Sequence, residues 1–403
     1  MSDRFDLVVV GGGIVGLASA RAIHRRDPRL SVAVLEKEPA VGLHQTGHNS
    51  GVVHSGVYYR PGSLKARLCH DGRAALLDFA AAEGVPSRTV GKLIVAARPA
   101  ELGMLDELHR RARANEVDGV ARLGAAELLG RLPGVAGLGA LHVPSAAIID
   151  FGAVARRLAE RLAADGVAVL VGRALRSARP TAAGWRLETG SGEVVAGYVV
   201  NCAGLHSDLV ARLMGTDPPV SIVPFRGDFY RLSDRLRDRI PTLVYPVPDP
   251  RLPFLGVHLT PTISGGLLAG PNATLAFTRE GYRRGQWDPA EVARQLAFPG
   301  TIGLARRYGR FAAGEWFKSW SPAEYLAAIR SVWPSATAGD LGPRTSGVRA
   351  QAVRRDGRLE DDFVFVRSDR ALHVLNAPSP AATAAFAIAE EVADAAGVGG
   401  GAR

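Results

Sequence analysis

Cysteine is scarce in this chain, with only Cys69 and Cys202 among 403 residues. The two lie far apart with no second thiol near either, which argues against a zinc knuckle, a redox pair or a disulfide framework, and no metal site is expected. No run of about 18 apolar residues occurs, so no membrane span is predicted. The opening residues MSDRFD carry two acids, which disfavours a secretory signal. These absences favour a reducing cytoplasm.

Acidic residues are also in deficit, with 39 Asp and Glu against 49 Lys and Arg and a net charge of +10. The excess is almost wholly arginine, and a solvated basic surface is its simplest interpretation. Attraction to an anionic membrane or to acidic substrates is the alternative. No nucleic-acid-binding module is recognisable, so no nucleic-acid partner is expected.

A strand–helix–strand unit opens the chain. Residues 6–10 (DLVVV) form a buried strand that runs into a helix over 11–26, and residues 31–37 (SVAVLEK) form a second strand. Pro28 lies in the turn between helix and strand, where a helix could not continue. Such a unit requires a parallel sheet covered by helices.

Farther along, the composition and hydrophobic pattern of the sequence change twice. Helix and strand patterns of the parallel-sheet type return before residue 217, whereas 218–270 is rich in prolines and short strand-like pieces typical of an antiparallel sheet. The last residues again read as strands and a closing helix. The fold class expected is mixed α/β (α+β): a Rossmann-type dinucleotide-binding domain with a discontinuous, mainly antiparallel-sheet substrate domain. The first comprises residues 1–87, 146–217 and 341–403, and the second comprises 88–145 and 218–340.

A glycine fingerprint joins the first strand to its helix. Gly11, Gly13 and Gly16 make GxGxxG, and Glu36 ends the next strand twenty residues after Gly16. The glycines permit a tight turn, a close approach to a pyrophosphate and close helix packing, and the acid binds ribose hydroxyls. Together these features predict dinucleotide binding, and an acid in place of an arginine leaves FAD or NAD.

Two later segments favour FAD over NAD. The strand at 198–204 (YVVNCAG) ends in small residues, Ala203 and Gly204 among them, which suits a close approach to the cofactor. The loop from Asn376 to Ala382 comes just before the last helix, whose positive end could face the flavin where negative charge accumulates on reduction. NAD would need no such contact from the C-terminal part of the chain.

Proton-handling groups crowd the segment from His44 to Cys69. Three of the ten histidines, His44, His48 and His54, fall within eleven residues there. Such groups are costly to bring near a bound cofactor unless they are used, so the segment is expected to carry chemistry.

Several stretches resemble the L-2-hydroxyglutarate dehydrogenase or oxidase family, within the D-amino-acid-oxidase-like group of FAD-dependent oxidoreductases. The first and last of them are long and specific, and together they span nearly the whole chain. They are HQTGHNSGVVHSGVYYRPGSLKARLC (44–69), GKLIVA (91–96), FLGVHLTP (254–261), GPNATLA (270–276), GVRAQ (347–351), DDFVF (361–365) and HVLNAPSPAATA (373–384).

The resemblance implies oxidation of L-2-hydroxyglutarate to 2-oxoglutarate, with electrons passing to FAD and then to a quinone or dioxygen. The reaction needs a base for the hydroxyl proton and cations for two carboxylates. His54 is the favoured base and His258 its rival. Arg349 is the favoured carboxylate clamp, because guanidinium binds carboxylate through two hydrogen bonds. The second carboxylate has four candidates, which are Lys65, Arg60, Tyr58 and Tyr59, although any of them could equally be a surface or packing group.

The expected cofactor contacts come from the fingerprint, the end of the second strand, the loop after residue 44, the end of the strand at 198–204 and the C-terminal loop. They are Gly11, Gly13, Gly16, Glu36, Lys37, Thr46, His48, Asn49, Ser50, Gly51, Ala203, Gly204, Asn376, Pro378, Ser379, Pro380 and Ala381.

Three alternatives stay open at this point. Residues 281–334 hold four of the five tryptophans and an excess of basic residues, so they could lie on a membrane surface, although ordinary helix packing is the favoured interpretation. A sister flavoenzyme acting on another 2-hydroxy acid or an amino acid would share most of these motifs. A basic FAD-bound protein that binds nucleic acid or a partner is the reading from a different functional class.

Overall fold

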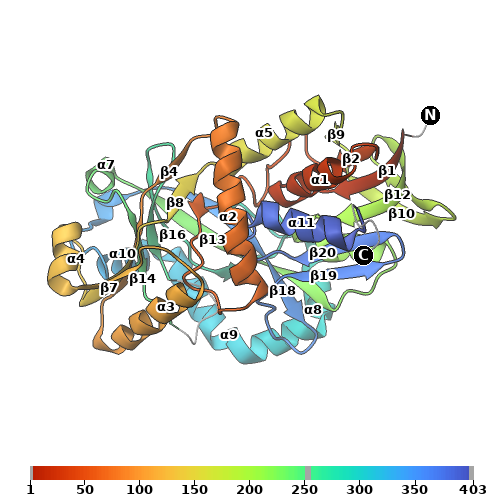
Figure 1. Ribbon diagram of the computed structural model, residues 1–403. Helices are drawn as coiled ribbons and strands as arrows, with labels where there is room; N and C mark the ends of the chain where they lie inside the picture. Colours follow the sequence, from red (N-terminus) through yellow and green to blue (C-terminus); the bar gives the residue numbers. More distant parts are fainter. Residues whose placement is uncertain (1–2, 250–255, 399–403) are drawn as a thin grey trace.

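An eight-stranded mixed sheet and a nine-stranded, mainly antiparallel sheet organise the computed structural model, which describes residues 3–249 and 256–398 (Figure 1). A third, three-stranded sheet consists of β3 (Val52–Val53), β8 (Ala147–Ile149) and β4 (Ser87–Thr89). In sequence, these strands lie between strands of the two larger sheets. Part of the FLGVHLTP stretch lies outside the described residues. The expected mixed α/β class, with a second and mainly antiparallel sheet, is confirmed.

The mixed sheet is built around β1, whose residues Leu7 to Val10 are buried because helices and strands cover both of its faces. β1 pairs in parallel with β2 and β12, as the opening strand–helix–strand pattern predicts. The strands are β1 (Asp3–Val10), β2 (Val32–Leu35), β9 (Ala168–Leu170), β10 (Leu175–Thr181), β11 (Gly184–Thr189), β12 (Gly192–Asn201), β19 (Val364–Ser368) and β20 (Ala371–Asn376).

Four helices bury one face of this sheet in a common core. In Figure 1, α11 lies beside α1, and α2 stands upright next to the end of α11. These helices are α1 (Ile14–Arg26), α2 (Leu64–Ala82), α5 (Phe151–Ala164) and α11 (Ala385–Ala395), while α6 (Ser207–Leu213) packs against the opposite face. The helical sequence pattern at the end of the chain extends back to Pro380, but residues 380–384 form turns and α11 begins at Ala385.

The nine-stranded sheet is antiparallel except where β14 pairs in parallel with β5. Its strands are β5 (Lys92–Ala96), β6 (Ala121–Gly124), β7 (Gly139–Val143), β13 (Val220–Leu232), β14 (Leu243–Pro246), β15 (His258–Pro261), β16 (Leu267–Gly270), β17 (Thr274–Leu275) and β18 (Leu341–Arg354). The helices that flank it are α3 (Leu102–Ala114), α4 (Ala125–Arg131), α7 (Asp234–Arg237), α8 (Pro289–Ala297), α9 (Pro299–Trp320) and α10 (Pro322–Arg330).

The expected domain boundary at residue 341 is not where the sheets divide. β18 pairs with β13 along almost its whole length, from Leu341 to Arg354. Residues 341–354 therefore belong to the nine-stranded sheet, and the chain returns to the mixed sheet only at β19. A strand pattern does not reveal its pairing partner, which explains the difference.

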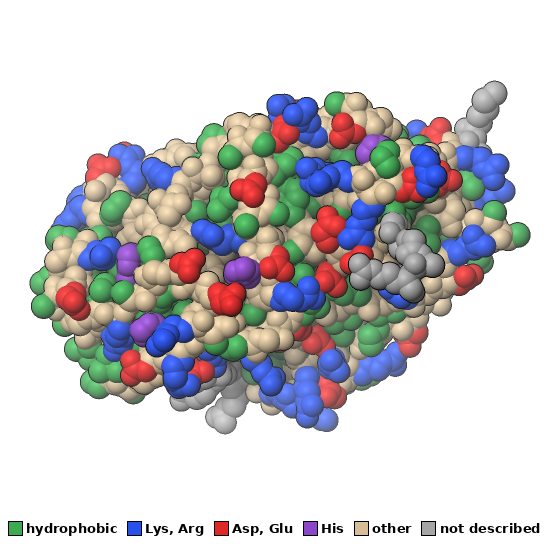
Figure 2. Space-filling view, viewed as in Figure 1, with side chains coloured by type: hydrophobic (Ala, Val, Ile, Leu, Met, Phe, Trp, Pro, Cys, Tyr) green, Lys and Arg blue, Asp and Glu red, His purple; other side chains and the backbone are tan. Residues whose placement is uncertain are grey.

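The charge distribution on the surface and the character of the helices test two expectations from the sequence, a solvated basic surface and the lack of a membrane span. Figure 2 shows basic side chains spread over the visible face and interspersed with acidic ones, which is the pattern of a solvated surface. Among the residues that the structure describes, no helix has the length and apolar character needed to cross a bilayer.

Candidate active site

Close backbone packing forms the glycine turn between β1 and α1. Gly11 has φ +115°, and a Cβ there would lie 2.4 Å from the carbonyl oxygen of Cys202. A Cβ on Gly16 would lie 2.0 Å from the carbonyl oxygen of Gly11. The helix N-cap, Gly13, has no side-chain capping bond, and the first turn of α1 has no acidic residue. This helix end fits an anionic phosphate, because its N–H groups and positive dipole end point outward.

Glu36 lies beside this turn at the end of β2, as predicted, and is 7% exposed. Its carboxylate accepts hydrogen bonds from the backbone N–H of Gly12 at 2.8 Å and of Glu38 at 2.9 Å. A carboxylate has about four acceptor positions, so two remain for ribose hydroxyls. Thr46 lies at the same helix end, where its Oγ1 accepts from the N–H of Ile14 at 3.1 Å.

The loop from His44 to Gly51 is held by its own hydrogen bonds. Asn49 donates from Nδ2 to the carbonyl oxygens of Gln45 and Thr46, and its Oδ1 accepts from the N–H of Gly51. The ring of His48 stacks on Tyr282 at 4.2 Å between centroids. These bonds orient the loop beside α1; the flavin contacts expected of His48, Asn49, Ser50 and Gly51 stay predictions.

The C-terminal loop meets the segment that carries His54, although more than 300 residues separate them in sequence. The N–H of His54 donates to Thr383 Oγ1 at 3.1 Å, and its Nε2 lies 3.4 Å from Ser379 Oγ. Asn376 donates from Nδ2 to the carbonyl oxygen of Asp362 at 2.7 Å, and its buried Oδ1 has no hydrogen-bond partner among the described residues. The predicted flavin loop and the predicted base therefore form one wall.

A cluster of cationic, imidazole and phenol side chains lies next to this wall. Side chains alternate along a strand, so Leu93 and Val95 of β5 enter one core while Lys92 projects from the opposite face of the sheet. Tyr245 on β14 and His258 on β15 project from that face as well, and their rings stack at 3.9 Å. We call this group the cationic cluster; its members are His54, Tyr58, Lys92, Tyr245, His258 and Arg349.

Both histidines of the cluster are uncharged near neutral pH. Burial, with the charges of Lys92, Arg349 and Lys65, lowers the pKa of His54 to about 3. Burial and the charges of Lys92, Arg349 and His54 likewise lower the pKa of His258 well below its usual value. Two cations therefore lie close enough to affect both imidazoles, and a neutral imidazole can accept a proton.

The two histidines differ in access. His54 is half-buried, whereas His258 is 5% exposed, stacked on Tyr245 and hydrogen-bonded through Nδ1 to Thr260 Oγ1 at 2.9 Å. Arg349 is half-buried on β18, and burial lowers its pKa. The structure thus brings together the three leading catalytic candidates, which come from three separate parts of the sequence.

Tyr59 and Lys65 lie at the edge of this group. Tyr59 forms a hydrogen bond with Ser379, and burial raises the pKa of Tyr59 well above its usual value. Lys65 Nζ pairs with Asp361 at 2.8 Å and lies 5.6 Å from the ring centroid of Tyr59. Because Lys65 already has a carboxylate partner, its predicted role toward a second substrate carboxylate is weakened.

Lys92 was missed by the sequence reasoning, although a signal was present. A lysine in the apolar run KLIVA cannot face solvent if the whole strand is buried, and all five residues of β5 are buried. A charge inside an apolar strand could have been read as a site residue.

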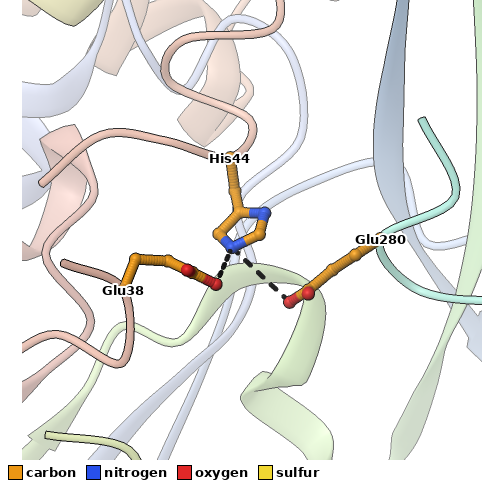
Figure 3. Close-up of side chains that lie close together, drawn as sticks. All are labelled: Glu38, His44 and Glu280. Carbon is orange, nitrogen blue, oxygen red and sulfur yellow. Dashed lines mark hydrogen bonds and ion pairs between the residues drawn. The ribbon is translucent and has the colours of Figure 1, made fainter. Parts of the chain in front are cut away.

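A second polar cluster lies at the other end of the 44–51 loop (Figure 3). Glu38 and Glu280 both approach His44, whose Nε2 lies 2.9 Å and 3.6 Å from their carboxylate oxygens. Lys37 Nζ contacts Glu38 and lies 2.7 Å from Glu280 Oε1, so an ammonium group already holds these carboxylates together. Burial opposes ionisation of Glu280, but hydrogen bonds from His206 and Lys37 lower its pKa to about 2. The ammonium group of Lys37 is engaged in these ion pairs. The cofactor contact expected of Lys37 stays a prediction.

Comparison with known proteins identifies the family to which this chain belongs. Residues 6–395 match the family described as DAO, FAD dependent oxidoreductase. The chain belongs to the FAD-dependent oxidoreductase family. It is 41% identical to the L-2-hydroxyglutarate dehydrogenase of Indibacter alkaliphilus over 97% of this chain and 98% of that protein. It is also 41% identical to the human mitochondrial L-2-hydroxyglutarate dehydrogenase over 98% of this chain and 89% of that protein.

Solved structures support the same fold. The FAD-bound L-alpha-glycerophosphate oxidase of Mycoplasma pneumoniae superimposes with a TM-score of 0.81 at 20% identity, over 98% of this chain and 95% of that one. Glycine oxidase from Geobacillus kaustophilus gives a TM-score of 0.72 at 18% identity, over 98% and 94% of the two chains. FAD is the cofactor, as predicted, and the α1 N-terminus with Glu36 fits it.

The glycine turn gives a direct test of how FAD is held. Gly16→Ala is expected to lower both the FAD content and the thermal midpoint, because the new methyl group would overlap the Gly11 carbonyl at a cost of about 1–3 kcal/mol. Gly103→Ala, in α3, is the matched control because a Cβ there meets open space. The ratio of flavin to protein absorbance and the midpoint of thermal unfolding are the measurements. Equal values for both variants would contradict this packing.

Proposed function

We propose that this protein oxidises L-2-hydroxyglutarate to 2-oxoglutarate. The relatives at 41% identity carry that name over nearly their whole length. The observation that favours it in this chain is the cationic cluster, where Lys92 and Arg349 flank two uncharged imidazoles. A substrate with two carboxylates and one hydroxyl needs two cations and a proton acceptor, and the cluster offers both cations and a neutral imidazole in either of two positions.

The reaction removes a hydride from C2 and a proton from the hydroxyl oxygen, which leaves a carbonyl at C2. Bound FAD supplies the acceptor for the hydride. In the proposal, Arg349 binds the carboxylate on C1 and fixes the orientation of C2. Its planar guanidinium can form two parallel hydrogen bonds with that carboxylate. The substrate carboxylates also offset the positive charges that depress the histidine pKa values, which makes a nearby imidazole a stronger base when substrate is bound.

His54 is the proposed base. Its ring is half-buried and its Nε2 faces the C-terminal loop, 3.4 Å from Ser379 Oγ. His258 stays the rival, but its ring is stacked on Tyr245 and its Nδ1 is bonded to Thr260. These contacts favour a supporting role for His258, because they fix its ring against the sheet.

The proposal is tested by anaerobic reduction of the flavin. L-2-hydroxyglutarate is expected to bleach the flavin absorbance, whereas its D isomer, glycine and malate are not. Reduction by glycine or by a different 2-hydroxy acid in preference to L-2-hydroxyglutarate would favour the sister-enzyme alternative. Reoxidation by dioxygen and by a quinone analogue then distinguishes the two proposed electron acceptors.

We further propose a cytoplasmic protein that contacts a membrane surface through residues 281–334. Trp287 is 67% exposed and Trp320 is 50% exposed, with Leu296 and Ile302 exposed as well. Trp333 is fully buried and belongs to the core, so only part of this region could lie on lipid.

Flotation with anionic vesicles tests this contact. The wild-type protein is expected to float with the vesicles, and Trp287→Ser with Trp320→Ser is expected to reduce the floated fraction several-fold. Leu129→Ser, an equally exposed apolar site on α4, is the control. Wild-type protein that stays entirely in the lower fraction would contradict the membrane contact.

A further inference from the structure

Lys92 is an unusual residue in this fold, because its side chain is 0% exposed while Nζ has no hydrogen-bond partner among the described residues. An ammonium group has three donors, and burying all of them unpaired is costly. Such a group persists where a ligand completes its hydrogen bonds. The catalytic roles proposed for His54 and Arg349 do not use it.

Aromatic rings surround the ammonium group. Its Nζ lies 4.3 Å from the ring centroid of Tyr245 and 5.2 Å from that of Tyr58. These cation–π contacts offset part of the cost of burial. The hydroxyl oxygen of Tyr58 is also buried without a hydrogen-bond partner among the described residues. Two neighbouring side chains therefore each carry a donor without a partner among the described residues, an ammonium and a phenol, and both can donate to a carboxylate oxygen.

Lys92 lies in the same site as the two histidines, separated from His258 by the ring of Tyr245. β5, β14 and β15 are neighbouring strands, and Tyr245 lies between Lys92 and His258 through a cation–π contact on one side and a ring stack on the other. Its charge also lowers the pKa of both His54 and His258. Lys92 thus belongs to the same site as the proposed base while lying beyond the Tyr245 ring from His258.

We propose that Lys92, assisted by the Tyr58 hydroxyl, binds the carboxylate at the far end of the substrate chain and so selects a dicarboxylate over a monocarboxylate of equal length. The inference rests on the proposed function. It assigns the second carboxylate to Lys92, which was not among the sequence candidates Lys65, Arg60, Tyr58 and Tyr59, and it keeps Tyr58 in an assisting role. Lys65 is the weaker candidate, because its ammonium is already paired with Asp361.

The test compares two substrates that differ only at the far end. L-2-hydroxypentanoate has a methyl group where L-2-hydroxyglutarate has its distal carboxylate. For Lys92→Met, kcat/KM with L-2-hydroxyglutarate is expected to fall about 10- to 100-fold, chiefly through KM, since a hydrogen bond to a charged group is lost. With L-2-hydroxypentanoate the change is expected to stay within about 3-fold. Lys92→Arg should restore part of the loss. Leu93→Met is the matched control, because Leu93 lies on the same strand with its side chain in the opposite core, and it is expected to leave kcat/KM with both substrates unchanged.

The outcomes separate the two proposals. Equal loss on both substrates would mean that Lys92 has a structural role only, and no loss on either would mean that the distal carboxylate binds elsewhere; both results overturn the inference. A wild-type flavin that L-2-hydroxyglutarate cannot reduce would overturn the proposed function and the inference with it.

A binding measurement covers the case in which Lys92→Met does not fold. Glutarate is titrated into the wild-type holoenzyme and followed by the flavin spectrum across pH. Burial lowers the pKa of Lys92 to about 8, whereas burial raises the pKa of Cys69 to about 12 and raises those of Tyr58 and Tyr245 above their usual values. His54 and His258 are uncharged throughout, and Arg349 stays charged.

Lys92 is therefore the group of this set that titrates near pH 8. Because it loses its charge as the pH rises, glutarate affinity is expected to fall above about pH 8 with the loss of one proton. Pentanoate, which lacks the second carboxylate, should show no such fall. Glutarate affinity that is constant up to pH 10 would overturn the inference.

Discussion

His54→Asn is expected to retain FAD and to slow anaerobic flavin reduction by L-2-hydroxyglutarate by about 10²- to 10⁴-fold. The imidazole is uncharged in the free protein because burial and the neighbouring cations lower its pKa to about 3. It can therefore accept the hydroxyl proton as the hydride leaves, while an amide cannot. Stopped-flow absorbance under anaerobic conditions measures this step apart from reoxidation.

His258→Asn is the matched comparison, because it removes the other imidazole of the cluster. Its ring is held by Tyr245 and Thr260, so a smaller decrease, about 10-fold, is expected. Near-normal reduction in His54→Asn together with a large decrease in His258→Asn would transfer the role of base to His258. The FAD content of both proteins, read from the flavin absorbance, shows whether either change acts through cofactor loss.

Arg349→Lys is expected to raise the apparent dissociation constant for L-2-hydroxyglutarate by about 10- to 100-fold with an unchanged thermal midpoint. Lysine keeps the positive charge but cannot form the two parallel hydrogen bonds of a guanidinium, which are worth about 1.5–3 kcal/mol each to a charged partner. Titration of the flavin spectrum with 2-oxoglutarate measures the affinity without turnover.

Arg344→Lys is the control for Arg349, since both lie on β18 and Arg344 contacts the ring of Tyr230 at 4.5 Å. No change in 2-oxoglutarate affinity is expected there. If Arg349→Lys bound 2-oxoglutarate as well as the wild type, the C1 carboxylate would have to be held by another cation. If the Arg349→Lys protein instead had a lower thermal midpoint than the wild type, the guanidinium of Arg349 would have a structural role.

Much of the cofactor-binding part could be predicted, because it depends on residues near one another in sequence. The turn at Gly11 to Gly16 and the acid at Glu36 are local features, and the structure places them together as expected. The position of β18 could not be predicted in the same way, since a strand pattern does not identify its partner. Its pairing with β13 places Arg349 in the sheet that also carries His258.

The catalytic part was predicted less completely, because it depends on contacts between distant residues. His54, His258 and Arg349 were each expected as site residues. The charge of Arg349 lowers the pKa of both histidines, which shows that the three side chains lie in one cluster. The sequence could not show that Lys65 is paired with Asp361 and that Lys92 has no hydrogen-bond partner within the described part of the chain. Both facts follow from tertiary packing, and they change which lysine is assigned to the second carboxylate.

A crystal structure of the FAD-loaded protein with 2-oxoglutarate bound would test the central claim most directly. We expect one carboxylate on Arg349 through two hydrogen bonds and the other within hydrogen-bond distance of Lys92 Nζ. The C2 oxygen is expected about 2.6–3.2 Å from a nitrogen of His54. A ligand bound with neither carboxylate on these two cations, or outside the cationic cluster, would contradict it.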